Sequence, residues 1–240
     1  MPAVCTLTII PVAGGLSAMI NRDELVGRAA AIPPRPVVRG TARLCMPLDP
    51  HSGGTWVGLA SAGYMLALLN FNPGTKPACG PRRNAASRGL VIPAVGLEDD
   101  MQGAVQAATR LDVSRTPPFR LVIAGRDQVA EVTSPGYGAP KSLRLLPLVE
   151  PLLFASSGLG DDLVDRPRRE LMNRFFGEDR ERWPRAQAEF HGHSWPKRPE
   201  VSVLMARAGA RTVSRTAVTI RGDHMNMTYE AFDPEPGVSA

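Results

Sequence analysis

The first 25 residues constrain the fold more than any other stretch, because their apolar side chains recur with the period of a β-hairpin. Residues 5–10 alternate, and Cys5 is the first of three apolar side chains on one face. Pro11 and the two glycines after it predict a turn, and residues 16–20 then resume the period of two. The chain is therefore expected to begin with two antiparallel strands.

The hairpin ends in four consecutive polar residues that lie close to the cysteine. If the turn lies midway, paired positions sum to about 26, which sets Cys5 beside Asn21 and Arg22. Asp23 and Glu24 follow directly. A guanidinium next to a thiol stabilises the thiolate, so this end of the hairpin is a candidate site.

The rest of the chain predicts an α+β fold of two packed antiparallel sheets with helices outside. Its 240 residues, 43% hydrophobic and 21% charged, suffice for one large domain or two small ones, which excludes a wholly disordered chain. The order is β-rich, then helix, strands, helices and strands again. We expect strands at 55–60, 64–71, 119–124, 128–133, 142–146, 201–207, 211–221 and 224–229, helices at 98–111, 164–176 and 179–190, an irregular connection with one short strand over 27–50, a surface loop over 72–86, and a loose tail over 233–240.

The basic charge does not indicate nucleic-acid binding. The net charge is +5 and the isoelectric point about 9.6, yet the arginines are dispersed and only three residues are lysines. The arginines of 168–169 and 180–185 alternate with acids, which is typical of solvated, salt-bridged helix faces. Aromatic residues make up only 5%, so stacking platforms are few. No nucleic-acid partner is expected.

The three cysteines show no CxxC spacing, which argues against both a disulfide framework and a structural zinc site. A reducing compartment follows. There is no apolar run of transmembrane length and no signal-peptide pattern, so we expect a cytoplasmic protein without an integral membrane segment. His191 and His193 could share a face as metal or haem ligands, but their neighbours favour a loop, and no metal site is expected.

Four short motifs occur in order along the first 90 residues. They are Asn21-Arg22-Asp23-Glu24 after an N-terminal strand, Gly53-Gly54-Thr55-Trp56-Val57-Gly58, Leu66-Ala67-Leu68-Leu69-Asn70, and Ser87-Arg88-Gly89. Together they resemble the family named for its Asn-Arg-Asp-Glu (NRDE) motif, the transport and Golgi organisation protein 2 family. Residues 201–215 are similar to the closing hairpin of this family.

The resemblance implies a fold and a class of ligand. It implies a single NRDE-family domain over 1–240, with a core of 5–232, and the four-layer αββα sandwich of N-terminal-nucleophile hydrolases. It also implies haem trafficking or lipid and acyl-thioester metabolism. The expected partner is a small amphiphile such as haem or acyl-CoA, with haem as cargo and no resident cofactor.

The choloylglycine hydrolase branch of the wider fold implies site residues. Cys5 resembles its nucleophile, Arg22 and Asp23 its charged residues after the first hairpin, and Asn70 the amide that ends a later strand. In such hydrolases the base is the nucleophile's own α-amino group, so residues 1–4 would have to be removed.

Three further residues are expected to bind ligand. They are Asn21, Glu24 and Ser156, the last standing where many family members have an asparagine. Structural explanations remain open beside these roles. Cys5 could be a small buried strand residue, Arg22 and Asp23 an ion pair that ends a hairpin, and Asn70 a strand-ending residue. The chain is thus a binding or trafficking protein, a cysteine amidohydrolase, or a protein with a purely structural role.

Overall fold

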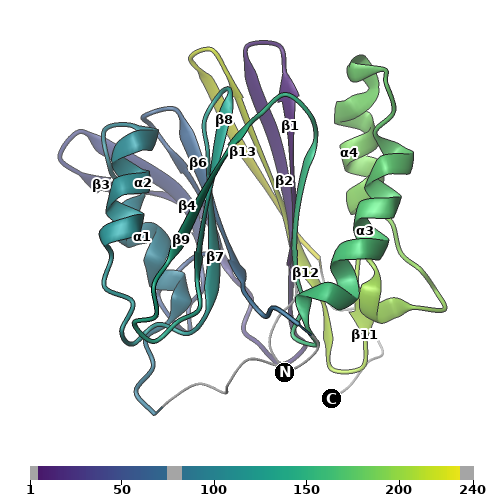
Figure 1. Cartoon of the computed structure of the whole chain (residues 1–240), viewed down its shortest axis with the longest axis horizontal. Helices are drawn as coiled ribbons and strands as arrows, with labels where there is room; N and C mark the ends of the chain where they lie inside the picture. Colours follow the sequence, from purple (N-terminus) through teal and green to yellow (C-terminus); the bar gives the residue numbers. More distant parts are fainter. Residues whose placement is uncertain (1–4, 75–82, 233–240) are drawn as a thin grey trace.

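The computed structural model describes residues 5–74 and 83–232. Two antiparallel sheets face each other, and helices cover both outer faces (Figure 1). Helices α1 and α2 lie on one side of the molecule, and α3 and α4 lie on the other. The layers therefore run helix, sheet, sheet, helix, which confirms the predicted αββα sandwich.

The first sheet carries the N-terminal hairpin at its centre, in the order β10-β1-β2-β12-β11, with β13 also paired to β12. Its strands are β1 (Cys5–Val12), β2 (Gly15–Leu25), β10 (Leu152–Ser156), β11 (Ala206–Arg207), β12 (Ala210–Arg221) and β13 (His224–Ala231). Cys5 pairs with Arg22 on one side and with Ser156 on the other. The predicted hairpin register is confirmed to within one residue.

The second sheet is a meander in which each strand pairs with the next along the chain. Its strands are β3 (Ile32–Arg39), β4 (Ala42–Leu48), β5 (Val57–Ala60), β6 (Tyr64–Asn70), β7 (Phe119–Ala124), β8 (Gln128–Ser134) and β9 (Ser142–Pro147). Side chains from both sheets meet in a core that includes Leu7, Ile20 and Val57. The alternation that predicted the strands is what fills this core.

Four helices and three short 3₁₀ turns complete the described chain. They are η1 (Arg88–Leu90), α1 (Val91–Val95), α2 (Met101–Arg110), α3 (Asp161–Phe175), η2 (Arg180–Arg182), α4 (Trp183–His191) and η3 (Pro199–Val201). Helix α2 packs against β7 and β8, and α3 and α4 pack on the first sheet. None of the helices in the described ranges is long and apolar enough to cross a membrane.

Several predicted elements need correction. Residues 27–50 form the hairpin β3–β4 rather than an irregular connection. Its prolines are tolerated because β3 is an edge strand whose outer N–H groups need no partner. Strand β10 was not expected, and most of 201–207 is not a strand but the end of η3 and a loop before the two-residue β11. The expected loop at 72–86 falls partly outside the described residues, and the expected tail at 233–240 falls wholly outside them.

The prediction of a solvated Arg168–Arg169 face is half wrong. Arg169 pairs with Asp165 on the surface of α3, at 2.9 Å. Arg168 is completely buried beneath the first sheet and donates to Thr6 Oγ1 at 2.8 Å and to the Ser202 carbonyl at 2.6 Å. The two residues are adjacent, but only one lies on the helix face that meets the sheet.

Candidate active site

The Asn-Arg-Asp-Glu motif lies at the end of β2 and projects to both faces of the sheet. Arg22 and Glu24 point between the two sheets, where Arg22 lies 4.2 Å above the ring of Trp56. Asn21 and Asp23 point to the opposite face, which α3 and α4 cover. This division follows from the two-residue period of a strand.

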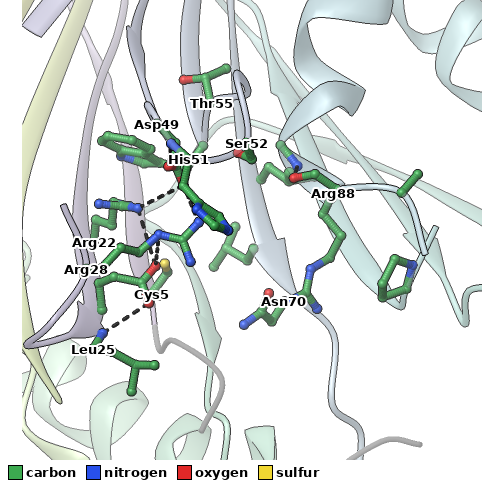
Figure 2. Close-up of a pocket in the computed structure, with 18 of the residues that line it drawn as sticks. Cys5, Arg22, Leu25, Arg28, Asp49, His51, Ser52, Thr55, Asn70 and Arg88 are labelled. Atoms are coloured by element: carbon green, nitrogen blue, oxygen red, sulfur yellow. Dashed lines mark hydrogen bonds and ion pairs between the residues drawn. The ribbon is translucent and has the colours of Figure 1, made fainter. Parts of the chain in front are cut away.

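A pocket of about 540 Å³ opens where Arg22 and Glu24 project. Its walls come from the start of β1, the ends of β2 and β6, and two loops of the second sheet, as Figure 2 shows. The polar lining residues are Cys5, Arg22, Glu24, Arg28, Asp49, His51, Ser52, Thr55, Asn70, Ser87 and Arg88, with Trp56, Leu68 and Leu69 among the apolar ones.

Cys5 places its thiol in the wall of this pocket and is only 7% exposed. Its backbone N–H donates to Ser156 Oγ at 3.2 Å. Burial, followed by the charge of Asp23, raises the pKa of the thiol to about 12, while the backbone N–H of Asp23 and the Arg22 charge partly oppose this. The thiol is therefore neutral near pH 7 as long as Cys5 is part of the continuous chain.

Two guanidiniums and two carboxylates form a compact cluster beside Cys5. Arg22 Nη2 lies 3.3 Å from Glu24 Oε2 and 3.4 Å from Asp49 Oδ2. Arg28 pairs with both acids as well, its Nε lying 3.5 Å from Glu24 Oε2. Burial raises the pKa of Asp49, but hydrogen bonds from Arg28 and from the His51 N–H outweigh it and leave that pKa below its ordinary value. The cluster fixes Arg22 next to the thiol.

Asn70 and Arg88 form the opposite wall (Figure 2). Asn70 is the last residue of β6 and is half-buried. Arg88 extends from the turn η1 into the pocket, and its Nη1 donates to the Pro118 carbonyl at 3.2 Å. A thiol with a guanidinium on one side and a side-chain amide across the pocket can position a carbonyl group between them.

The comparisons with known proteins agree with this geometry. The family model described as Transport and Golgi organisation 2 (TANGO2) matches residues 16–185, which is more than half of the chain. The chain belongs to the TANGO2 family. No curated protein sequence gave a significant match.

Two solved structures show that this TANGO2-family chain has the N-terminal-nucleophile hydrolase fold. One is the Caenorhabditis elegans N-acylethanolamine-hydrolyzing acid amidase ortholog, with a TM-score of 0.60 and 15% identity over 89% of this chain and 91% of that chain. The other is penicillin V acylase from Agrobacterium tumefaciens, with a TM-score of 0.50 and 10% identity over 95% of this chain and 86% of that chain.

Behind the sheet, the TANGO2-family chain has a buried polar layer. Asn21 Nδ2 donates to the carbonyls of His191 and Val203, both at 2.9 Å, and its Oδ1 lies 3.1 Å from His191 Nδ1. Since Asn21 Oδ1 can only accept, Nδ1 of His191 carries the proton and Nε2 accepts from Thr8 Oγ1, 2.8 Å away. Burial, then the charges of Arg215 and Arg168, lower the pKa of His191 to about 3.

Asp23 belongs to the same layer and is completely buried. Its Oδ1 accepts from Thr212 Oγ1 at 2.5 Å. Burial raises its pKa to about 7, although the charge of Arg168, the Thr212 bond and the charge of Arg207 act in the opposite direction. The backbone N–H of Asp23 interacts with the Cys5 thiol, but Asp23 is not among the residues that line the pocket.

The predicted site residues are therefore divided between two places. Cys5, Arg22, Glu24 and Asn70 line the pocket. Asn21 and Asp23 lie behind it, and Ser156 supports the Cys5 backbone from the neighbouring strand. The expected loop at His191 is wrong, because His191 ends helix α4 and is fully buried. No cluster of metal-ligating side chains occurs among the described residues.

Sequence reasoning missed five pocket residues that carry charge or a polar ring. They are Arg28, Asp49, His51, Trp56 and Arg88. Trp56 and Arg88 stand in the family motifs, but no ligand-binding role was predicted for either of them. Asp49 and His51 come from the loop after β4, whose position depended on a hairpin that was not expected.

Proposed function

We propose that this chain is a cysteine amidohydrolase of the N-terminal-nucleophile type, with Cys5 as nucleophile. The observation that carries the proposal is the Cys5 thiol in the wall of a pocket of about 540 Å³, between Arg22 and Asn70. Supporting it, the two solved structures with this fold are named an amidase and an acylase. The substrate class that follows is a small amide with an acyl chain.

The reaction requires the α-amino group of Cys5 to be free. Residues 1–4 precede Cys5 and lie outside the described residues, and their removal supplies an amine with a pKa near 8. This amine takes the thiol proton, and the thiolate attacks the amide carbonyl carbon. The C–N bond then breaks, and the leaving amine takes the proton back from the α-ammonium group. Water hydrolyses the thioester to a carboxylic acid and restores the thiol.

Arg22 and Asn70 have separate roles in this scheme. Arg22 lies beside Cys5 in the sheet and is held by Glu24 and Asp49, so its charge favours the thiolate over the thiol. Asn70 faces the thiol across the pocket, where its amide can donate to the oxyanion of the tetrahedral intermediate. Asp23, buried behind Cys5, holds the end of β2 through Thr212.

Intact mass and turnover test the proposal together. We expect the mature chain to begin at Cys5 and to release fatty acid from N-dodecanoylethanolamine. Cys5→Ala should abolish product formation, whereas Cys45→Ala, which removes a half-buried thiol outside the pocket lining, should keep it. A mature chain that begins at Met1 or Pro2, or equal turnover by Cys5→Ala, would contradict the proposal.

A second candidate is binding or trafficking of haem or acyl-CoA in the cytoplasm. Two observations favour it: the Cys5 thiol has a pKa of about 12, and the exposed imidazole of His51 lines the pocket. Imidazole is an axial ligand of haem iron. Saturable haem binding with a Soret shift that His51→Ala removes would support haem as cargo. Titration with acyl-CoA tests the other ligand, and no saturable binding of either refutes this candidate.

A further inference from the structure

Arg88 differs from the other two arginines of the pocket. Arg22 and Arg28 each pair with Glu24 and Asp49. Among the described residues, no carboxylate forms an ion pair with Arg88, whose one hydrogen bond goes to the Pro118 carbonyl. Most of the five N–H donors of this guanidinium are therefore available to a ligand bound in the pocket.

The chain holds Arg88 in this position through a tight contact between two motifs. The Ser87 hydroxyl accepts from the Gly89 N–H at 3.2 Å, and the Gly89 carbonyl accepts from the Thr55 N–H at 2.9 Å. A Cβ on Gly54 would lie 2.4 Å from the Gly89 carbonyl carbon. Only glycine lets the turn η1 approach this closely, so the Arg88 side chain starts from a fixed backbone at the pocket edge.

The charge of the lining indicates what enters. Its three guanidiniums face two carboxylates, which leaves one excess positive charge, on Arg88. Partial burial lowers the pKa of Arg88, although the charges of Cys5, Tyr137 and Glu24 act in the opposite direction. Arg88 is half-buried, so its charge is only partly solvated and a bound anion would stabilise it. One excess charge matches a monoanion such as a carboxylate, which a guanidinium binds with two parallel hydrogen bonds.

We propose that Arg88 determines substrate specificity by binding a carboxylate of the substrate, so that the site hydrolyses N-acyl amino acids. This rests on the proposed function. Arg88 lies across the pocket from Cys5 and beside Asn70, so the carboxylate is held at one wall while the amide carbonyl meets the thiol at the other (Figure 2). Arg22 remains with the nucleophile, and Arg88 selects the ligand.

The first test compares two substrates that differ in the charged group. The ratio of kcat/KM for N-dodecanoylglycine to that for N-dodecanoylethanolamine is measured in the mature chain. We expect the wild type to prefer the glycine amide and Arg88→Gln to lower that ratio about 10- to 100-fold, the range for a hydrogen-bonded charged group. Arg88→Lys should retain part of the preference. Arg166→Gln, which removes an exposed arginine of α3 paired to Glu170, is the matched control. An unchanged ratio in Arg88→Gln overturns the proposal.

The second test separates this proposal from the proposed function. Binding of N-dodecanoylglycine is measured by calorimetry in Cys5→Ala and in Cys5→Ala combined with Arg88→Gln. Weaker binding in the double variant, without turnover by the wild type, supports the carboxylate site and refutes hydrolysis. Turnover by the wild type with equal binding in the two variants refutes the carboxylate site and leaves hydrolysis standing.

Discussion

Asp23 and His191 are two buried titratable residues whose pKa values are displaced so that each stays neutral more easily. Burial raises the pKa of Asp23 from 3.8 to about 7 and lowers that of His191 from 6.5 to about 3. The folded chain therefore holds the Asp23 proton more tightly than the unfolded chain, so this contribution to stability is lost as the pH rises from about 4 to 7. The His191 contribution is present above pH 6.5 and is lost as the pH falls. Between pH 4 and 6.5, the Asp23 contribution to the free energy of unfolding falls as the pH rises, whereas the His191 contribution increases.

In Asp23→Asn, the pH dependence of the free energy of unfolding should reflect His191 without the opposing effect of Asp23. Without the Asp23 titration, the free energy of unfolding should rise with pH between 4.5 and 6.5 more steeply than in the wild type, by up to about 1.4 kcal/mol per pH unit. Urea unfolding at several pH values measures this. Asp165→Asn, at the exposed pair with Arg169, should follow the wild-type slope. Parallel curves for Asp23→Asn and wild type would show that Asp23 does not titrate as described.

At this scale the sequence predicted the pairing of Cys5 with Arg22, because a hairpin register is a local property. It did not predict Asp49 or His51 in the pocket, because their position depends on how a loop closes. Nor could the sequence show which two residues of the Asn-Arg-Asp-Glu motif point into the pocket, because that depends on which face of β2 the helices cover.

Helix α3 is held against the rest of the fold by one buried side chain, that of Arg168. Arg168 ties it to β1 through Thr6 and to η3 through the carbonyls of Val201 and Ser202. Arg168→Met should lower the free energy of unfolding by about 3–5 kcal/mol, because it leaves three buried acceptors, on Thr6, Val201 and Ser202, without their donor. The neighbouring Arg169→Met should cost no more than about 1 kcal/mol, since its pair is exposed. Chemical denaturation of both variants measures the difference; equal losses would contradict it.

The turn η1 depends on glycine instead. Gly54→Ala places a methyl group against the Gly89 backbone and should cost about 1–3 kcal/mol while displacing Arg88 from the pocket. Thermal unfolding measures the first effect and the substrate preference the second. Gly27→Ala is the matched control, because nothing lies within 4 Å of its added Cβ. Wild-type stability in Gly54→Ala would show that η1 adapts.

Elements with clear periodicity were predicted to within a few residues, as at β7 and α2. The failures have physical causes. The prolines of β3 disguise an edge strand, and β10 is a five-residue apolar strand whose partner β1 lies about 150 residues away. Pattern within a short window carries no information on such pairing.

For the whole molecule, the state of the N-terminus should control thiol chemistry. In a chain that retains residues 1–4, the raised pKa of Cys5 should make alkylation by iodoacetamide at pH 7.5 very slow. In a chain that begins at Cys5, the α-amine takes the proton and alkylation should be at least about 10-fold faster. Mass spectrometry in a background of Cys45→Ala and Cys79→Ala, which leaves Cys5 as the one thiol of the sequence, follows the reaction. Equal rates would show that the amine does not activate the thiol.

The layered architecture itself followed from the order of strands and helices and from the family motifs, and the structure confirms it. The pocket did not follow, because it lies between the two sheets and takes its walls from segments far apart in the sequence. The sandwich brings these segments together at one end.

The division of the Asn-Arg-Asp-Glu motif between two faces has an evolutionary consequence. Asn21 and Asp23 are matched to His191 and Arg168 on the covering helices. In related sequences, an exchange at either of these two positions should therefore be accompanied by an exchange in α3 or α4. Arg22 should instead vary together with the acids of its cluster. Residues of one short motif should therefore be under two separate constraints: packing against the helices for Asn21 and Asp23, and the geometry of the pocket for Arg22.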